Sequence, residues 1–238
     1  MKQRAEHPII ALLVPTTSRG FRWMKITQAP VVRFMLPSIA KAVEPGFIFR
    51  IYIGYDIGDL YFDSPVHIAG LAQIFQDEVE ESCKRRYIIC ELILQGFQNT
   101  LCKPGPMFNF LSASAISDGA DYVYRVNDDS ELRTSWASAF TLKLASFNPP
   151  NVGVVGPTCK EGNEGILTHD FVHKTHAYIF SVHYPPLLMD WWMDDWISTL
   201  YNKDSTSRME NVLVVHHIDS TSEGAVRVRL RGASRLSV

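Results

Sequence analysis

The sequence predicts an α/β domain with a central, mostly parallel sheet flanked by helices. Strand-like apolar runs alternate with helix-like segments, the first of these runs is apolar throughout, and an acidic cluster follows the fourth. A chain of 238 residues with 46% hydrophobic content is long enough to bury one substantial core. We therefore expect residues 1–238 to form a single domain.

The first half of the chain, residues 8–125, reads as strand–helix units. Residues 8–16 form a continuous apolar run, which is typical of a strand buried on both faces. Pro37 is expected to interrupt the first helix, because proline has no N–H and its ring clashes with the preceding turn. The expected strands are 8–16, 47–56, 87–97 and 121–132, and the expected helices are 29–43, 67–86 and 105–120.

The second half, residues 126–220, is expected to continue the same alternation. The pattern indicates helices at 136–147 and 190–201 and strands at 151–158 and 211–219. The segment from Thr158 to His176 contains glycines, histidines and Asp170, and it fits either a mobile wall over a ligand or a plain surface loop. Residues 221–238 form a basic tail, for which nothing sharper is predicted.

Composition excludes several classes of protein. The net charge of -2 gives no reason to expect nucleic acid or an anionic membrane as the main partner. No apolar run approaches the roughly 20 residues that span a bilayer. The four cysteines form no CxxC pair, so reduced, buried thiols are expected. We expect a cytoplasmic protein or a soluble part of a larger or membrane-associated one.

The stretch "VNDDSEL" places three carboxylates at the end of the fourth expected strand. One of them could cap the next helix, but a cap needs a single acceptor and this stretch also offers the Asn127 amide. Crowded carboxylates are relieved by a bound cation, and oxygen ligands suit Mg²⁺ or Mn²⁺. Open α/β sheets bind ligands beyond the carboxyl ends of their strands, so a metal site is expected here.

A second acidic pair, Asp194 and Asp195, lies among tryptophans in "WWMDDW". Desolvation by these rings would raise the pKa of a carboxylate and make it a stronger base, while the rings themselves suit either a sugar face or core packing. The pair could instead cap a helix. Late in the chain, His216 and His217 occupy opposite faces of a strand end, so one of them can point into the same crevice.

Together, "VNDDSEL", "WMDDW" and "VVHHID" make the sequence resemble a glycosyltransferase of the GT-A fold. The first stretch is similar to the DxD metal-binding motif of that fold, the second to the acidic motif with the catalytic base of inverting members, and the third to the late histidine that completes the metal shell. Their order matches as well, from Pro8 to about Asp219. Each motif is short, so order and spacing carry the resemblance.

The resemblance implies a nucleotide-sugar donor, most simply a UDP-sugar, bound by the first half of the chain. It assigns Pro15, Thr16 and Thr17 to the base or ribose, Arg19 to a phosphate, Asp56 to the base, Asn109 to the base or ribose, and Asn127 and Asp128 to the ribose and donor sugar.

For the reaction itself, the resemblance implies that Asp129 and His217 hold Mn²⁺ or Mg²⁺ against the diphosphate. Asp195 would be the base of an inverting transfer, with Asp194 contacting acceptor or donor. The acceptor would be a hydroxyl of a glycan, a glycoprotein or another molecule. Asn127 departs from the motif because it carries no charge. A sugar nucleotidyltransferase and a non-catalytic carbohydrate- or nucleotide-binding domain of the same fold remain alternatives.

Overall fold

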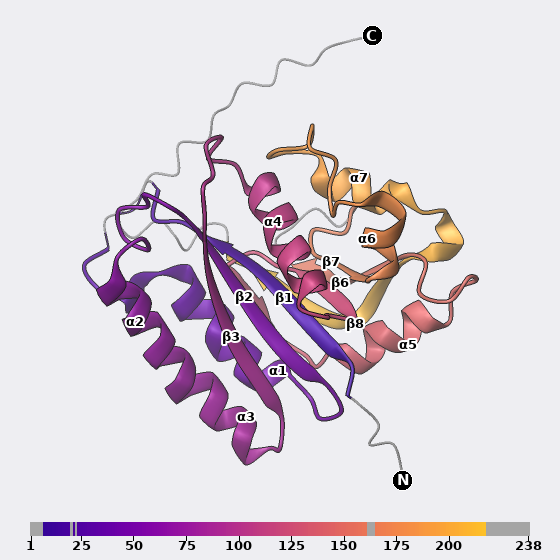
Figure 1. Ribbon diagram of the computed structural model, residues 1–238. Coiled ribbons are helices and arrows are strands. Elements are labelled where there is room, and N and C mark those ends of the chain that lie inside the picture. The colour runs from indigo at the N-terminus through magenta and orange to yellow at the C-terminus, as the bar shows by residue number, and fades with distance from the viewer. Residues whose placement is uncertain (1–6, 20, 22, 161–164, 218–238) are drawn as a thin grey trace.

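The computed structural model describes residues 7–19, 21, 23–160 and 165–217. In these residues eight strands form one sheet, in the order β3-β2-β1-β4-β7-β6-β8-β5 (Figure 1). The strands are β1 (Ile9–Thr16), β2 (Ile48–Asp56), β3 (Ile89–Phe97), β4 (Tyr122–Arg125), β5 (Ser130–Leu132), β6 (Val154–Lys160), β7 (Asp170–His173) and β8 (Thr206–His216).

The helices pack on both faces of the sheet. They are η1 (Ile26–Gln28), η2 (Val31–Met35), α1 (Leu36–Ala42), α2 (Pro65–Ile74), η3 (Phe75–Glu80), α3 (Glu81–Arg85), α4 (Pro104–Ser117), α5 (Ala137–Ala145), α6 (Thr175–Phe180), α7 (Met193–Leu200) and η4 (Lys203–Ser205). None of the helices in the described residues has the length and apolar character that crossing a bilayer requires.

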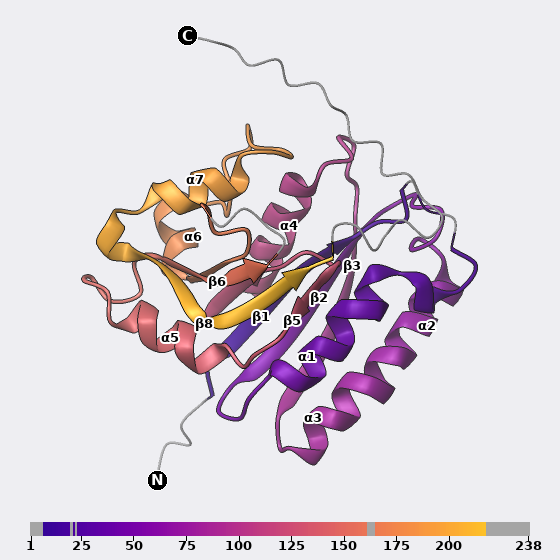
Figure 2. The same cartoon turned by 180° about the vertical axis from the view of Figure 1, so that it is seen from behind.

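The apolar first strand separates two cores. Ile10 and Leu12 of β1 point into a core shared with α1, α3 and α5, whereas Ala11 and Leu13 point into a core shared with α4 and α7. Figures 1 and 2 show these two helical layers from opposite sides. Because both faces are covered, the strand is apolar at every position rather than at alternate ones.

The predicted α/β architecture with a mostly parallel sheet is confirmed. Strands β3, β2, β1 and β4 run parallel, and β6 pairs in parallel with β8. The other three pairings, β4 with β7, β6 with β7 and β5 with β8, are antiparallel. The parallel strands place the ends of β1, β2 and β4 at one edge, where ligands bind in open α/β sheets.

Three expected elements differ from the structure. The strand expected over 121–132 is two strands, because the chain leaves β4 after Arg125 and pairs again only as β5, antiparallel to β8 at the far edge. Pro37 does not end the first helix: it lies where the π-type turn η2 passes into α1, and the backbone stays helical through Met35 and Leu36 up to Ala42. The segment from Thr158 to His176 is not a plain loop, because it contributes the end of β6 and all of β7.

Candidate active site

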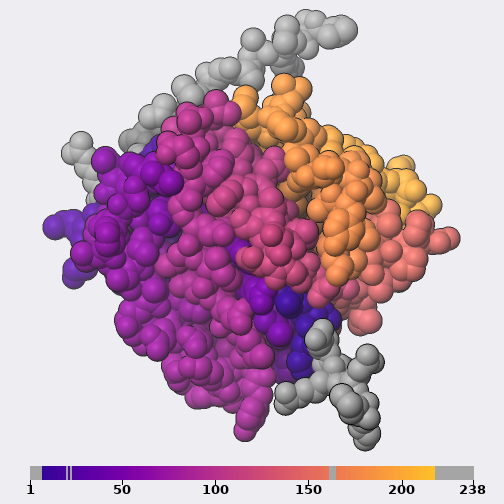
Figure 3. Space-filling view, in the orientation of Figure 1, coloured from indigo at the N-terminus to yellow at the C-terminus, as the bar shows by residue number. Residues whose placement is uncertain are grey.

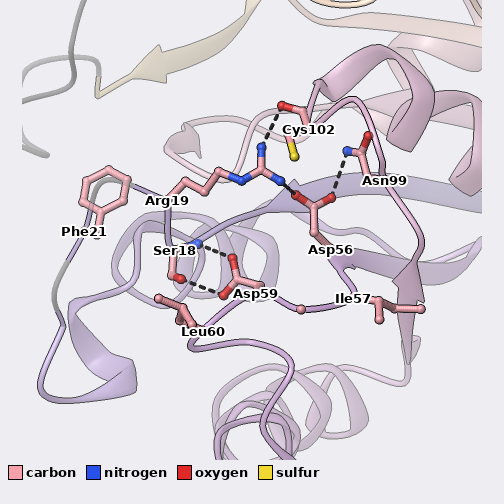
Figure 4. Close-up of a pocket in the computed structure, with 10 residues that line it drawn as sticks. Ser18, Arg19, Phe21, Asp56, Ile57, Asp59, Leu60, Asn99 and Cys102 are labelled. Carbon is pink, nitrogen blue, oxygen red and sulfur yellow. Dashed lines mark hydrogen bonds and ion pairs between the residues drawn. The ribbon is translucent and has the colours of Figure 1, made fainter.

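A cavity of about 580 Å³ opens at the carboxyl ends of β1 and β2 (Figure 4). It is lined by Ser18, Arg19, Phe21, Asp56, Ile57, Gly58, Asp59, Leu60, Asn99 and Cys102. The carboxylate of Asp56 pairs with the Arg19 guanidinium and accepts a hydrogen bond of 2.8 Å from the Asn99 amide. Predicted donor residues Arg19 and Asp56 therefore share one cavity, and Asn99 is a further polar member that the sequence did not indicate.

Asp59 fixes the chain that follows β1. Its carboxylate accepts hydrogen bonds from the Ser18 N–H at 2.8 Å and the Ser18 hydroxyl at 2.6 Å, and another from the Thr17 hydroxyl at 3.1 Å. The N–H groups of Tyr61 and Phe62 donate to the same carboxylate. Burial raises the pKa of Asp59, but these hydrogen bonds outweigh it and hold the pKa below its usual value. The predicted ligand residue Thr17 is not among the residues that line the cavity, but Asp59 holds it next to Ser18, which is.

The acidic turn after β4 lies beside the end of β1. The hydroxyl of Thr16 donates to Asp128 Oδ2 at 2.8 Å, which joins two residues predicted to contact the donor. Pro15 precedes Thr16 on β1 and pairs in register with Gly54 of β2. Asp129, the next residue of the turn, is 1% exposed. The turn therefore carries one carboxylate at the strand end and one directed into the protein.

His216, rather than His217, faces Asp129. The Nε2 atom of His216 lies 2.9 Å from Asp129 Oδ1 and 3.3 Å from the Asn127 amide nitrogen. The ring of His217 instead stacks on Phe34, with 4.1 Å between centroids, and its Nε2 atom lies 3.0 Å from Glu131 Oε2. The imidazole beside Asp129 is therefore that of His216. The predicted ligand His217 lies beside Phe34 and Glu131.

The donor set at the turn fits a divalent ion shared with a substrate. A carboxylate and an imidazole facing each other at 2.9 Å offer the oxygen and nitrogen ligands that suit Mn²⁺. Within the described part of the chain, no three His, Cys, Asp or Glu side chains gather into a metal cluster. Ions such as Mg²⁺ commonly take one or two protein ligands and complete their shell with water and substrate phosphate.

Arg125, the last residue of β4, links this turn to the second acidic pair. Its guanidinium lies 2.9 Å from Asp194 Oδ1, donates to the Thr168 carbonyl and sits 4.7 Å from the centre of the Phe108 ring. The side chain is buried. Burial alone would lower the pKa of Arg125, but the neighbouring acidic groups, Asp194 first and then Tyr184 and Asp170, together outweigh it, so the guanidinium stays charged. One buried cation thus connects β4, α4 and α7.

The two carboxylates of the pair have different surroundings. Burial raises the pKa of Asp194, and Arg125 opposes that rise only in part. Asp195 is half-buried, and its carboxylate makes no hydrogen bond or ion pair within the described residues. Burial and then the charges of Asp194 and Asp129 raise the pKa of the Cys159 thiol to about 11, so both acidic segments act on one thiol of β6.

Asn109 serves packing in this structure. Its amide donates to the Tyr184 carbonyl at 2.9 Å and accepts from the Tyr184 N–H at 2.8 Å, which ties α4 to the chain before α7. Asn109 is not among the residues that line the cavity. Asp170, expected in a wall or loop, is fully buried in β7 and accepts hydrogen bonds from His183 and Tyr184.

Comparison with solved structures identifies the architecture. The crystal structure of S. aureus TarS 1-349 matches with a TM-score of 0.57 at 12% identity, covering 87% of this chain and 60% of that one. Its complex with UDP-GlcNAc matches with a TM-score of 0.53 at 12% identity, covering 92% and 62%, and its complex with UDP with 0.54 at 14%, covering 87% and 60%. TarS is a GT-A-type glycosyltransferase. The chain has the GT-A fold.

The chain spans 60–62% of the length of these TarS chains. No protein-family model matches its sequence, and no curated protein does. The GT-A fold nevertheless explains why the sequence motifs converge: β1, β2 and β4 are neighbours in the sheet, so the cavity and the acidic turn lie at one edge.

Several residues of this candidate site carry no signal in the sequence. Arg125 is a charged residue in a strand, and only its partner 69 positions later reveals its role. Asn99 and Asp59 lie in loops without a motif. Strand alternation indicated that His216 and His217 face opposite sides, but the side that meets Asp129 depends on how β8 pairs with β5.

Proposed function

We propose that the chain is a metal-dependent glycosyltransferase that moves a sugar from a UDP-sugar to an acceptor hydroxyl. The supporting observation is the ion pair between Arg125 and Asp194. It holds the helix that carries Asp194 and Asp195 beside the acidic turn, at the edge of the sheet where the cavity opens. The UDP and UDP-GlcNAc complexes of TarS, a protein of the same fold, support the choice of donor.

In this proposal the cavity binds the nucleoside and the acidic turn meets the diphosphate. Asp56, oriented by Asn99 and Arg19, accepts a hydrogen bond from the base. Asp129 and His216 hold Mn²⁺ or Mg²⁺, with His217 as the alternative imidazole from the sequence prediction. The ion, when bound, supplies Lewis-acid stabilisation of the departing diphosphate.

Asp195 is proposed as the general base of an inverting transfer. Its carboxylate is not engaged by another described side chain, so it can take the proton of an acceptor hydroxyl. Asp194 is held by Arg125 and would orient the acceptor or donor through its remaining oxygen. Desolvation around the pair strengthens both roles, since charges interact more strongly away from water.

Substitution of each aspartate tests this assignment. In an assay with a panel of UDP-sugars and simple acceptors, Asp195→Asn is expected to lower kcat by about 10²- to 10⁴-fold and to leave UDP affinity unchanged. Asp194→Asn is expected to affect KM as well as kcat, and NMR of the product should show inverted anomeric configuration. Full turnover by Asp195→Asn, or a product of retained configuration, would remove Asp195 as the base.

A further inference from the structure

An exposed apolar patch lies on the loop that leads into α7. Its members are Leu187 (85% exposed), Met189 (37%), Trp191 (77%) and Trp192 (67%), and we call it the tryptophan patch. Isolated exposed apolar residues are ordinary, but several on one loop mark a binding surface. In Figure 3 this orange segment borders the magenta start of α4 at the upper edge of the molecule.

The loop is held in place although its largest side chains face solvent. The Gly105 N–H donates to the Met189 carbonyl at 2.8 Å, and Lys103 Nζ lies 2.6 Å from Asp190 Oδ2. Position 105 needs a glycine, because a Cβ there would lie 2.5 Å from the Leu188 carbonyl oxygen. These two contacts fix the loop at the residues immediately before the two tryptophans.

Trp192 adopts a backbone conformation that large residues rarely take. Its φ is 74°, in the left-handed region that favours glycine. Such strain persists where the surroundings enforce it, and it is concentrated at binding and catalytic sites. Here it sits immediately before Met193, so the same strained turn directs the tryptophan outward and starts the helix that carries Asp194 and Asp195.

The patch lies between the two parts of the proposed reaction centre. On one side its loop continues into α7 and the acidic pair. On the other it contacts the loop of Lys103, whose neighbour Cys102 lines the nucleoside cavity. An acceptor must approach the base and the donor together, so this surface is where acceptor groups beyond the reacting hydroxyl would rest.

We propose that the tryptophan patch binds the sugar rings of a saccharide acceptor; this inference rests on the proposed transferase function. Aromatic rings offer flat apolar surface to the C–H face of a pyranose, and Asp190 and Lys103 offer hydrogen bonds to hydroxyls at its edge. An anionic membrane is disfavoured as occupant, because residues 187–195 carry three aspartates and no basic residue, and the neighbouring Lys103 is paired with Asp190.

Binding of labelled protein to an oligosaccharide microarray tests this surface without any turnover. The array carries terminal hexoses, N-acetylhexosamines, pentoses and deoxyhexoses. Wild-type protein is expected to bind at least one class of glycan, and Trp191→Ala to bind it about tenfold more weakly, as loss of one aromatic contact implies. Tyr178→Ala, which removes a comparably exposed ring (68%) from α6, is the matched control and should bind as wild type does.

Further measurements separate failure of the patch proposal from failure of the transferase proposal. Binding of UDP to each variant by calorimetry should be unchanged; absence of UDP binding to the wild type would contradict the transferase function, whereas the array reports on the patch alone. The patch proposal is overturned if no glycan binds, or if Trp191→Ala binds as wild type does. It is equally overturned if Trp191→Ala abolishes sedimentation with phosphatidylcholine–phosphatidylglycerol vesicles, or dimers seen by light scattering, without changing glycan binding.

Discussion

At the scale of single residues, Arg125 carries a buried positive charge between two acidic segments. Its guanidinium meets Asp194 at 2.9 Å, and Asp170 contributes a further negative charge nearby. Removing one partner of a buried ion pair leaves the other charge buried without compensation. Breaking this ion pair is therefore expected to destabilise the protein more than forming it stabilises the protein. The pair also holds the first turn of α7 against the end of β4.

The variant Arg125→Met is expected to lower the free energy of unfolding by roughly 3–5 kcal/mol, because Asp194 then remains as an unpaired buried charge. The double variant Arg125→Met/Asp194→Asn should recover part of that loss, since no ionised group is left behind. Urea unfolding of the three proteins measures both effects. Arg50→Met, which breaks the more exposed pair with Glu91, is the control and should cost about 1 kcal/mol or less.

If Arg125→Met unfolds at the urea concentration of the wild type, the guanidinium does not compensate Asp194. The coupling between the acidic turn and the acidic pair would then have to be carried by other contacts.

At the scale of elements, a buried histidine on α6 joins that helix to the chain around α7. His176 Nε2 faces the His183 carbonyl at 2.9 Å, so this nitrogen carries the hydrogen, and Nδ1 accepts from the Tyr201 hydroxyl at 2.8 Å. Both ring nitrogens are thus used in the neutral form. Burial lowers the pKa of His176 to about 4.

The free energy of unfolding is expected to fall as the pH drops from about 6.5 to about 4. In this range His176 binds a proton in the unfolded chain but not in the folded protein. A histidine whose pKa falls from 6.5 to about 4 on folding contributes up to about 3 kcal/mol, present above pH 6.5 and lost toward pH 4. Urea unfolding at pH 7.0 and 4.5 measures it. His176→Gln should show a smaller loss of stability over this range; an equal loss in both proteins would contradict a neutral His176.

The elements that the sequence predicted are long and carry their own apolar pattern, whereas those that it missed are short and depend on pairing with distant strands. Long segments such as β1, the helical run from α2 to α3, and α4 carry their own apolar pattern, so the sequence predicted their type and order. Strands β5 and β7 have three and four residues, and they exist because distant strands pair with them. No local pattern distinguishes β7 from a loop, and none separates β5 from the rest of the strand expected over 121–132.

The same distinction holds for the candidate site. Five predicted residues lie at or just after the carboxyl ends of strands that the sequence predicted to be parallel, so their gathering at one edge was predictable: Thr16, Arg19, Asp56, Asp128 and Asp129. Asn109 was expected near the nucleotide but bonds the Tyr184 backbone, because its position on α4 is fixed by helix packing. Short motifs indicate which residue types are used, whereas long-range pairing decides which of them meet.

At the scale of the whole molecule, one sheet divides two cores and presents three strand ends along one edge. The cavity, the acidic turn and the acidic pair all lie along that edge, and Arg125 and Asp59 hold them there. The basic tail expected over 221–238 falls outside the described residues, as do residues 161–164 of the segment expected to be either a mobile wall over a ligand or a surface loop. The single domain expected over 1–238 stays a prediction.

The central claim is that the acidic turn holds a divalent ion and, through it, a nucleotide diphosphate. Isothermal titration of UDP and GDP into the chelator-stripped protein, with and without Mn²⁺, tests it most directly. The account predicts Mn²⁺-dependent binding of UDP in preference to GDP, at least about tenfold weaker in Asp129→Ala and unchanged in Asp77→Ala, a control on the exposed side of η3. Failure of both nucleotides to bind under every metal condition would contradict it.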